Sequence, residues 1–262
     1  LAVFLLVGLM PTSVFADELP AAQTEAAAGA SQASAAPDAD ETDEAEDVSA
    51  EPDEEPAAET DGGSGQPAAE PQTDVFKTKG GKDVVITAIK HATMRIQYDG
   101  KEIHVDPVGK KMDPATDYAK FPKADLIFVT HEHFDHYDKD AIDALKKEGT
   151  EIYLNPAVKK LYGSGTALTN GETKVISKEI KVEAVPAYNT TKGREKFHPK
   201  GRDNGYVLTI DGLRIYIAGD TEDIPEMKDI KDIDVAFLPC NQPYTMTPEQ
   251  LVNAAKIIKP KV

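Results

Sequence analysis

The stretch FVTHEHFDHYDKD (residues 128–140) follows an apolar run and places three of the chain's six histidines within six residues. Because side chains two apart on an extended strand point the same way, His131 and His133 can bind one metal ion together. Asp135 and His136 follow in the turn, where they can face a second ion. Imidazole nitrogen and carboxylate oxygen are the ligands that zinc takes at open catalytic sites. A strand end needs no such cluster for stability, so the stretch predicts a metal centre.

A further ligand is predicted in IYIAGDTED (residues 215–223), where Asp220 ends another buried strand. A carboxylate has two oxygens, so one such side chain can bridge two metal ions. The alternative is that Asp220 caps a helix beginning near Thr221. The Gly-Asp-Thr turn alone supports a metal site weakly, but its combination with the histidine cluster favours one strongly.

Short β-branched runs surround these motifs. Strands are predicted for VVITAI (84–89), TMRIQY (93–98) and KEIHV (101–105), with Asp99-Gly100 as a hairpin signal. Later strands alternate with helices, which predicts a layered α/β domain with mixed sheets and helices outside. The closing KPKV (259–262) looks like the opening of one more strand.

Two helices are predicted from their boundary signals. DKDAIDALKKEG (138–149) is expected to be a helix that stops at Gly149. TPEQLVNAAKIIKP (247–260) has Thr247 as N-cap, proline at the first helical position and Gln250 to close a capping box.

The excess of acidic over basic residues lies in one segment of the chain. Of 46 acidic residues, 18 lie in residues 17–74, which have no Lys or Arg, so 28 acids remain against 29 bases. We expect this Ala-, Glu- and Pro-rich segment to be a disordered spacer, because it cannot bury enough apolar surface to order itself. The remaining chain is nearly neutral and gives no electrostatic argument for binding nucleic acid.

The first residues, LAVFLLVGLMPTSVFADE, resemble the end of a secretory signal peptide that is cleaved after Ala16. We therefore expect an exported protein with no stable membrane span after cleavage. Residues 1–16 would be the end of the signal peptide, residues 17–74 the spacer, and residues 75–262 the folded domain. Cys240 is the only cysteine, so no intrachain disulfide is possible; in FLPCN it is expected to pack in the core, with a catalytic thiol the lesser alternative.

The motif THEHFDH is similar to the His-x-His-x-Asp-His motif of the metallo-β-lactamase superfamily, and AGDT resembles its aspartate motif. The order of strands and helices fits the αββα sandwich of that superfamily, from about Val84 to the end of the sequence. KHATMRI, HVDP and PYTMTPEQ further resemble the branch that includes L-ascorbate-6-phosphate lactonase and many metal-dependent hydrolases.

The resemblance implies a ligand set for two metal ions. His131 and His133 would bind the first ion, Asp135 and His136 the second, and Asp220 would bridge them. Such a pair of ions activates a shared water as hydroxide and stabilises the developing oxyanion, while Asp135 orients the water or accepts its proton. The family also has a last second-site histidine shortly after a segment like KPKV, and we expect that ligand to follow Val262.

At Asn189 the sequence departs from the family, which usually has another first-site histidine at the matching position of VPAYN. An amide oxygen is a poorer zinc ligand than imidazole but suits Mn²⁺ or Mg²⁺. Three outcomes are open: Asn189 ligates weakly, His198 nine residues on substitutes for it, or the second site stands alone. Because the first cluster and Asp220 are complete, we favour a retained centre of two divalent ions, with zinc as the first choice.

Three further residues and one loop are candidates near this centre. His91 is most simply a hydrogen-bonding residue, although the family places it close to the site, and His104 inside a strand is structural. Asp106 can orient a ligand histidine from its turn. The long basic loop of residues 189–205 is either a solvated loop or a lid, in which Lys192, Arg194, Lys200 or Arg202 would meet an anionic substrate group.

The leading functional hypothesis is an exported metal-dependent hydrolase of a small ester, lactone or phosphoester. A phosphodiesterase or nuclease is a second enzymatic reading, disfavoured by the neutral folded part and the lack of an aromatic and basic stripe. A non-catalytic binding module that lost one metal site is a third. We expect a small-molecule substrate and no nucleic acid, and the fold alone does not decide the substrate.

Overall fold

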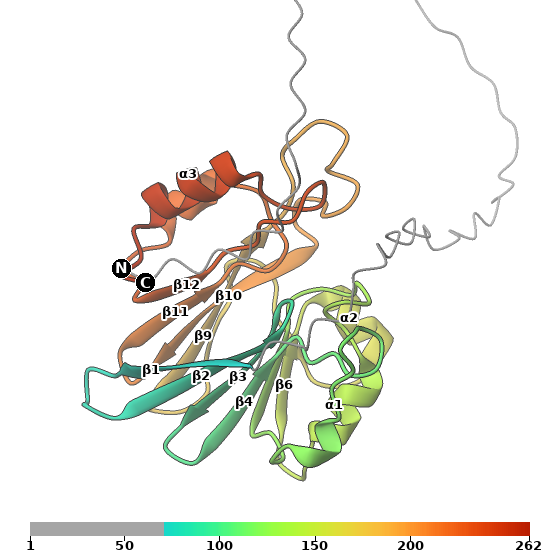
Figure 1. The fold of residues 1–262 in the computed structure, drawn as a ribbon, viewed down its shortest axis with the longest axis vertical. Helices are drawn as coiled ribbons and strands as arrows, with labels where there is room; N and C mark the ends of the chain where they lie inside the picture. The colour runs from blue at the N-terminus through green and yellow to red at the C-terminus, as the bar shows by residue number, and fades with distance from the viewer. Residues whose placement is uncertain (1–70) are drawn as a thin grey trace, which may run out of the picture. The chain divides into compact units, whose positions relative to one another are not determined.

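The computed structural model describes residues 71–262. Two sheets lie face to face, with α1 and α2 outside one and α3 outside the other (Figure 1). The elements are β1 (Gln72–Lys77), β2 (Asp83–Lys90), β3 (Thr93–Tyr98), β4 (Lys101–Val105), η1 (Tyr118–Lys120), β5 (Leu126–Val129), α1 (Lys139–Leu145), β6 (Glu151–Leu154), α2 (Pro156–Tyr162), β7 (Thr166–Ala167), β8 (Thr173–Val175), β9 (Ile180–Ala187), β10 (Asp203–Ile210), β11 (Leu213–Ile217), η2 (Pro225–Asp229), β12 (Val235–Phe237) and α3 (Pro248–Ile258).

The first sheet follows the chain in the order β1-β2-β3-β4-β5-β6-β7. Neighbouring strands from β1 to β4 pair antiparallel, and neighbouring strands from β4 to β7 pair parallel. Asp99 and Gly100 form the tight turn between β3 and β4 with φ of 47° and 77°, as the Asp-Gly pair predicts. The switch to parallel pairing at β4 brings the carboxyl ends of β4 and β5 to one edge, where the histidine motif begins.

The second sheet has the order β12-β11-β10-β9-β8, antiparallel except for the parallel pair of β11 and β12. The end of the sequence lies beside β12, where Val262 donates its amide to the Asp234 carbonyl and accepts from Ala236. These two bonds have parallel register, so KPKV does open along a strand. The short edge strands β7 and β8 are exposed and carry no apolar periodicity that would predict them.

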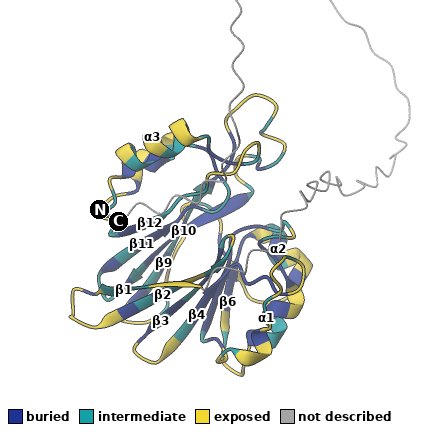
Figure 2. Ribbon diagram, viewed as in Figure 1, coloured by how far each residue is buried: buried dark blue, intermediate teal, exposed yellow. Residues whose placement is uncertain are grey.

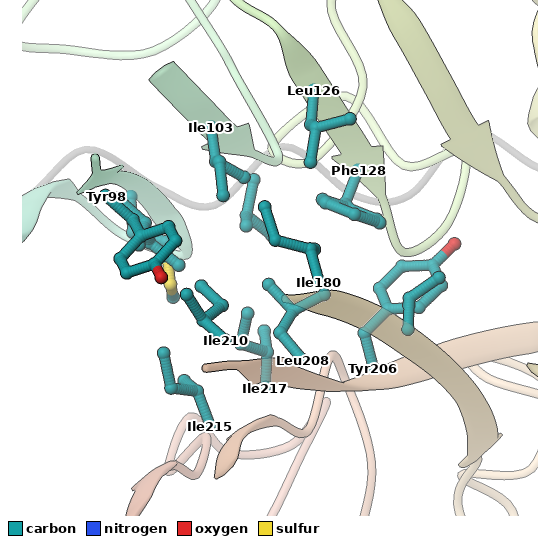
Figure 3. Packing of buried hydrophobic residues seen from close by; sticks show 14 of the residues in the cluster. Tyr98, Ile103, Leu126, Phe128, Ile180, Tyr206, Leu208, Ile210, Ile215 and Ile217 are labelled. Atoms are coloured by element: carbon teal, nitrogen blue, oxygen red, sulfur yellow. The ribbon is translucent and has the colours of Figure 1, made fainter. Parts of the chain in front are cut away.

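The main core lies between the two sheets, where isoleucine, valine and tyrosine side chains from both meet (Figure 3). Strand alternation decides which residues enter it. In β5, Leu126 and Phe128 point into this core, and Ile127 and Val129 point to the helices on the other face. All four are buried, and a strand buried on both faces reads as a continuous apolar run.

Two smaller cores fix the outer helices. Ile142, Leu145 and Val158 of α1 and α2 pack on the outer face of the first sheet, and Ala254 and Ile258 of α3 pack on the second. Figure 2 shows the exposed sides of these helices turned away from the sheets. The αββα sandwich predicted from the sequence is therefore confirmed. The capping box of Thr247 and Gln250 forms at the start of α3 as predicted.

Two local predictions were wrong. The helix expected up to Gly149 ends at Leu145, because Lys146 turns to an extended conformation and Thr150 Oγ1 accepts the amide of Lys147. Cys240, expected in the core, is exposed, because β12 already ends at Phe237 and the chain leaves the sheet before reaching it.

The domain boundary expected at residue 75 falls inside β1, because residues from Gln72 onward already pair with β2. The predicted signal-peptide end (1–16) and nearly all of the predicted spacer (17–74) lie outside the described residues. Within residues 71–262, none of the helices has the length and apolar character needed to cross a bilayer.

Candidate metal centre

The predicted ligands gather where several strands end. The histidine motif follows β5, Asp220 follows β11, and His91 lies in the turn between β2 and β3. The loop between β9 and β10 adds His198 from the second sheet. Three groups of side chains have ligand atoms within 4.8 Å of one another: His131, His133 and His198; His91, Asp135 and His136; and His131, His136 and Asp220.

The first cluster is made of three imidazoles. Nε2 of His131 lies 3.1 Å from Nδ1 of His133, a separation that two ligands of one ion can have, because each zinc–nitrogen bond is about 2.0–2.1 Å. His198 brings its ring to 5.1 Å and 4.9 Å from the rings of His131 and His133, measured between centroids. The β5 strand end therefore supplies two ligands of this cluster, and the β9–β10 loop supplies the third.

The second cluster combines a carboxylate with two histidines. Oδ2 of Asp135 lies 3.1 Å from Nε2 of His91 and 3.9 Å from Nε2 of His136. His91, predicted to be a hydrogen-bonding residue near the site, thus stands within ligand distance of this cluster. It adopts a φ of 42°, a left-handed conformation that costs energy for a non-glycine residue and that concentrates at functional sites.

Asp220 lies between the two clusters and directs one oxygen to each. Its Oδ1 is 3.3 Å from Nε2 of His136, and its Oδ2 is 3.5 Å from Nε2 of His198. The alternative that Asp220 caps a helix is wrong, because residues 221–224 form no helix and η2 begins only at Pro225. The turn depends on Gly219, at φ 65°, where a Cβ would lie 2.8 Å from the Asn204 carbonyl oxygen.

Asp106 holds the second cluster from behind, as predicted for a residue that orients a ligand. Its fully buried carboxylate contacts Nδ1 of His136 at 2.8 Å through Oδ2 and accepts the Thr130 amide at 2.8 Å through Oδ1. Thr130 Oγ1 also donates to Asp106 at 2.8 Å and lies 3.0 Å from Nδ1 of His131. A carboxylate on one ring nitrogen of a histidine leaves the other nitrogen free to bind a metal.

The nitrogens directed into the clusters fit a metal ion. Nε2 of His136 and Nε2 of His198 are both buried without an aligned hydrogen-bond partner, although each lies near Asp220. Their Nδ1 atoms are both engaged, by Asp106 and by the Tyr244 carbonyl oxygen. Buried polar atoms are normally hydrogen-bonded, so two orphaned nitrogens that face one carboxylate indicate places for cations.

The charges of the cluster residues agree with this arrangement. Burial lowers the pKa of His131 well below its usual range and that of His198 to about 4. Burial also opposes a charge on His136, but Asp220 and Asp106 outweigh it and raise its pKa well above the usual value. Burial opposes the charge of Asp220 as well, yet His136 keeps its pKa low. A divalent ion would therefore replace a proton at this pair.

The basic loop is held by carboxylates along its length. Arg194 lies 3.4 Å from Glu222 and Lys200 lies 2.7 Å from Glu226. Arg202 forms two bonds with Asp203, at 2.8 Å and 2.9 Å. Three of the four cations proposed to meet an anionic substrate are thus paired within the protein, and the fourth, Lys192, is exposed.

Sequence reasoning missed two residues that support the site. Glu222 is fully buried, and its Oε2 accepts the amides of Thr190 and Thr191 at 2.8 Å and 2.7 Å, which fixes the start of the loop. Thr130 joins Asp106 to His131. Thr130 directly precedes His131, and Glu222 follows Asp220 by two residues, positions that could have identified them.

Comparisons with known proteins identify the family. The profile of the β-lactamase superfamily domain matches residues 85–262. A UPF0173 metal-dependent hydrolase of Ligilactobacillus salivarius is 34% identical over 191 residues, which cover 67% of this chain and 81% of that protein. Another of the same name, from Thermococcus onnurineus, is 31% identical over 188 residues, which cover 68% and 81%.

Solved structures agree. A protein from Parabacteroides distasonis whose crystal structure is named as that of a metal-dependent hydrolase has 57% sequence identity to this chain and a TM-score of 0.70. The match covers 73% of this chain and 86% of that one. The metallo hydrolase Igni18 of Ignicoccus hospitalis is 27% identical, with a TM-score of 0.57, and covers 68% and 79%. The chain belongs to the metallo-β-lactamase superfamily, and it is a metal-dependent hydrolase of that superfamily.

Proposed function

We propose that the enzyme hydrolyses a small ester, lactone or phosphoester at a centre of two divalent ions. His131, His133 and His198 would hold the first ion, Asp135 and His136 the second, and Asp220 both. His91 stands close enough to Asp135 and His136 to complete the second site within the described residues.

The observation that carries the proposal is the position of Asp220. Its two oxygens face different histidines, His136 at 3.3 Å and His198 at 3.5 Å, from two separate clusters. A carboxylate that served a single ion would need only one of these contacts. The arrangement matches a carboxylate ligand that two ions would share.

The bound ions would supply Lewis acidity, which activates water and polarises the scissile bond at neutral pH. The chain's own residues do the positioning. Asp106 and Thr130 fix the rings of His136 and His131 from behind. The pKa of Asp135 is lowered, because His91 and His136 outweigh the effect of its burial. Asp135 is therefore ionised at neutral pH and can accept a hydrogen bond at Oδ2, where His91 Nε2 already lies 3.1 Å away.

Zinc is the ion that the first cluster suits best, because three imidazole nitrogens are typical of catalytic zinc sites. The second cluster contains more oxygen and would also accept manganese. With His198 in the first cluster, the donor set there no longer requires the amide oxygen of Asn189, which was the reason to consider Mn²⁺ or Mg²⁺ at that site.

The substrate is proposed to be a small molecule rather than a nucleic acid, because the cations of the loop are mostly paired and the acids and bases outside residues 17–74 are nearly balanced. Export is proposed from the apolar run and the small residues before Ala16. An exported enzyme would meet zinc outside the cytosol, and the acidic segment would separate its domain from the site of signal cleavage.

To test the proposal, the full-length protein is assayed for hydrolysis of a substrate panel that contains p-nitrophenyl esters, a lactone and bis-p-nitrophenyl phosphate. After treatment with a chelator, zinc or manganese should restore turnover in the parent but not in Asp220→Ala or His133→Ala. Asp223→Ala is a matched control in the same loop, because the half-buried Asp223 side chain accepts a hydrogen bond from exposed Asn253 and belongs to none of the three ligand groups. Parent-like turnover by Asp220→Ala would refute the proposal.

A further inference from the structure

Asn189 occupies the position where the family motif led us to expect a ligand; its Nδ2 is held by main-chain carbonyls, and its Oδ1 is buried without a hydrogen-bond partner. Nδ2 donates to the main-chain carbonyl oxygens of Tyr244 at 2.7 Å and Arg194 at 3.1 Å. The side chain is almost fully buried, with 2% of the residue's surface exposed. Two carbonyl acceptors fix which end of the amide is nitrogen, since an oxygen placed there would repel both.

The same residue also contacts the substitute ligand. The Asn189 main-chain amide donates to the carbonyl oxygen of His198 at 2.9 Å. The Tyr244 carbonyl that accepts from the Asn189 side chain also lies 3.2 Å from Nδ1 of His198. Asn189 therefore holds both the main chain of His198 and the acceptor that orients its ring.

The orientation of the His198 ring decides whether it can bind a metal. A carbonyl oxygen can only accept, so Nδ1 must carry the proton and Nε2 the lone pair. That Nε2 is buried, has no hydrogen-bond partner and lies 3.5 Å from Asp220. If the Tyr244 carbonyl moved, Nδ1 would lose the contact that fixes this tautomer.

We propose that Asn189 is a positioning residue for the first metal site, which acts through His198. Its side-chain amide joins the main chain at Arg194 to the main chain at Tyr244, and its main-chain amide binds the His198 carbonyl oxygen. Together these bonds hold the His198 ring against His131 and His133. The inference rests on the two-ion centre of the proposed function. It predicts that metal affinity at the first site depends on the two hydrogen-bond donors of the amide.

The decisive variant is Asn189→Asp, which keeps the shape and removes both donors. Zinc affinity of each site is measured on the full-length protein by competition with a chromogenic chelator, and the bound zinc is counted by mass spectrometry. First-site affinity should fall about 10–100-fold, as for other residues that orient metal ligands, and second-site affinity should stay within about twofold. His198→Ala should lower first-site affinity at least as much.

The double variant separates positioning from direct ligation. If Asn189 acts only through His198, Asn189→Asp should add less than about twofold to the loss caused by His198→Ala. Independent, multiplying losses would overturn the proposal, because Asn189 would then contact the ion itself through Oδ1. Parent-like first-site affinity in Asn189→Asp would overturn it as well.

A folding defect is controlled by a second variant, Asn189→Ala, and by the unfolding temperature of each metal-free protein. Joint loss of both zinc ions in both variants would also overturn the proposal, because Asn189 would then support the fold as a whole. The parent distinguishes this inference from the proposed function. If the parent binds fewer than two ions, the proposed function fails; if parent and Asn189 variants all bind two with equal affinity, only the role of Asn189 fails.

Discussion

Replacing Asp106 by Asn should weaken the second metal site while leaving the fold in place. Oδ1 of Asp106 accepts a hydrogen bond from the Thr130 amide. Oδ2 accepts one from the Thr130 hydroxyl and also lies in hydrogen-bond contact with Nδ1 of His136. An asparagine that still accepts the Thr130 amide must turn its NH₂ group toward Nδ1 of His136. Nδ1 would then have to accept a hydrogen bond, and the proton would move to Nε2, the nitrogen that faces Asp220 and Asp135.

The size of the effect follows from this change of tautomer. Loss of a residue that orients a ligand histidine typically costs about 10–100-fold in metal affinity, which is about 1.4–2.7 kcal/mol at the second site. The first site should change less, because His131 Nδ1 keeps its contact with Thr130. Zinc titration of the metal-free protein, with both sites resolved by chelator competition, measures the two affinities.

A matched control separates this effect from the loss of any buried carboxylate. Asp138 is also buried, and its side chain accepts the Gly109 amide and the Asp140 amide at the start of α1. Asp138→Asn should lower stability without a selective loss at the second site. If Asp106→Asn binds its second zinc ion as tightly as the parent, or if both variants lose it equally, Asp106 does not set the tautomer of His136.

Two further predictions concern stability. Burial lowers the pKa of His104 to about 4, so the folded state binds the His104 proton more weakly than the unfolded state does. The free energy of unfolding therefore falls as the pH drops from about 6.5 to about 4, by at most about 1.4 kcal/mol per pH unit. His104→Leu should flatten denaturant-measured stability in that window, and an unchanged pH slope would contradict this. Gly219→Ala should cost about 1–3 kcal/mol, because its φ is 65° and its Cβ would meet the Asn204 carbonyl; a Tm equal to the parent's would contradict it.

The parts of the site that lie on strand ends could be predicted from the sequence. Side-chain alternation led us to expect His131 and His133 together, and the structure brings them together although β5 already ends at Val129. An apolar run that ends in Asp220 places a carboxylate beside them. The same local rules predicted the Asp99-Gly100 turn and the start of α3, because hairpin and capping signals act over a few residues. These features depend on neighbours in the sequence, which one chain displays in full.

The part that could not be predicted depends on contacts between distant segments. His198 lies in a loop without periodicity, and its place is decided by Asn189, Glu222 and the Tyr244 carbonyl, which come from different parts of the chain. The sequence therefore left Asn189 and His198 as open alternatives. The role of His91 near Asp135 was underestimated for the same reason, since only the sheet brings the β2–β3 turn to the β5 strand end.

A centre of two ions bridged by Asp220 can be verified from the metal content of the full-length protein. Metal-free parent and Asp220→Ala are saturated with zinc, separated from excess metal and analysed by native mass spectrometry. We expect two zinc ions per parent chain and at most one per Asp220→Ala chain, with hydrolysis lost. One ion or none in the saturated parent, or two ions retained by Asp220→Ala, would contradict it.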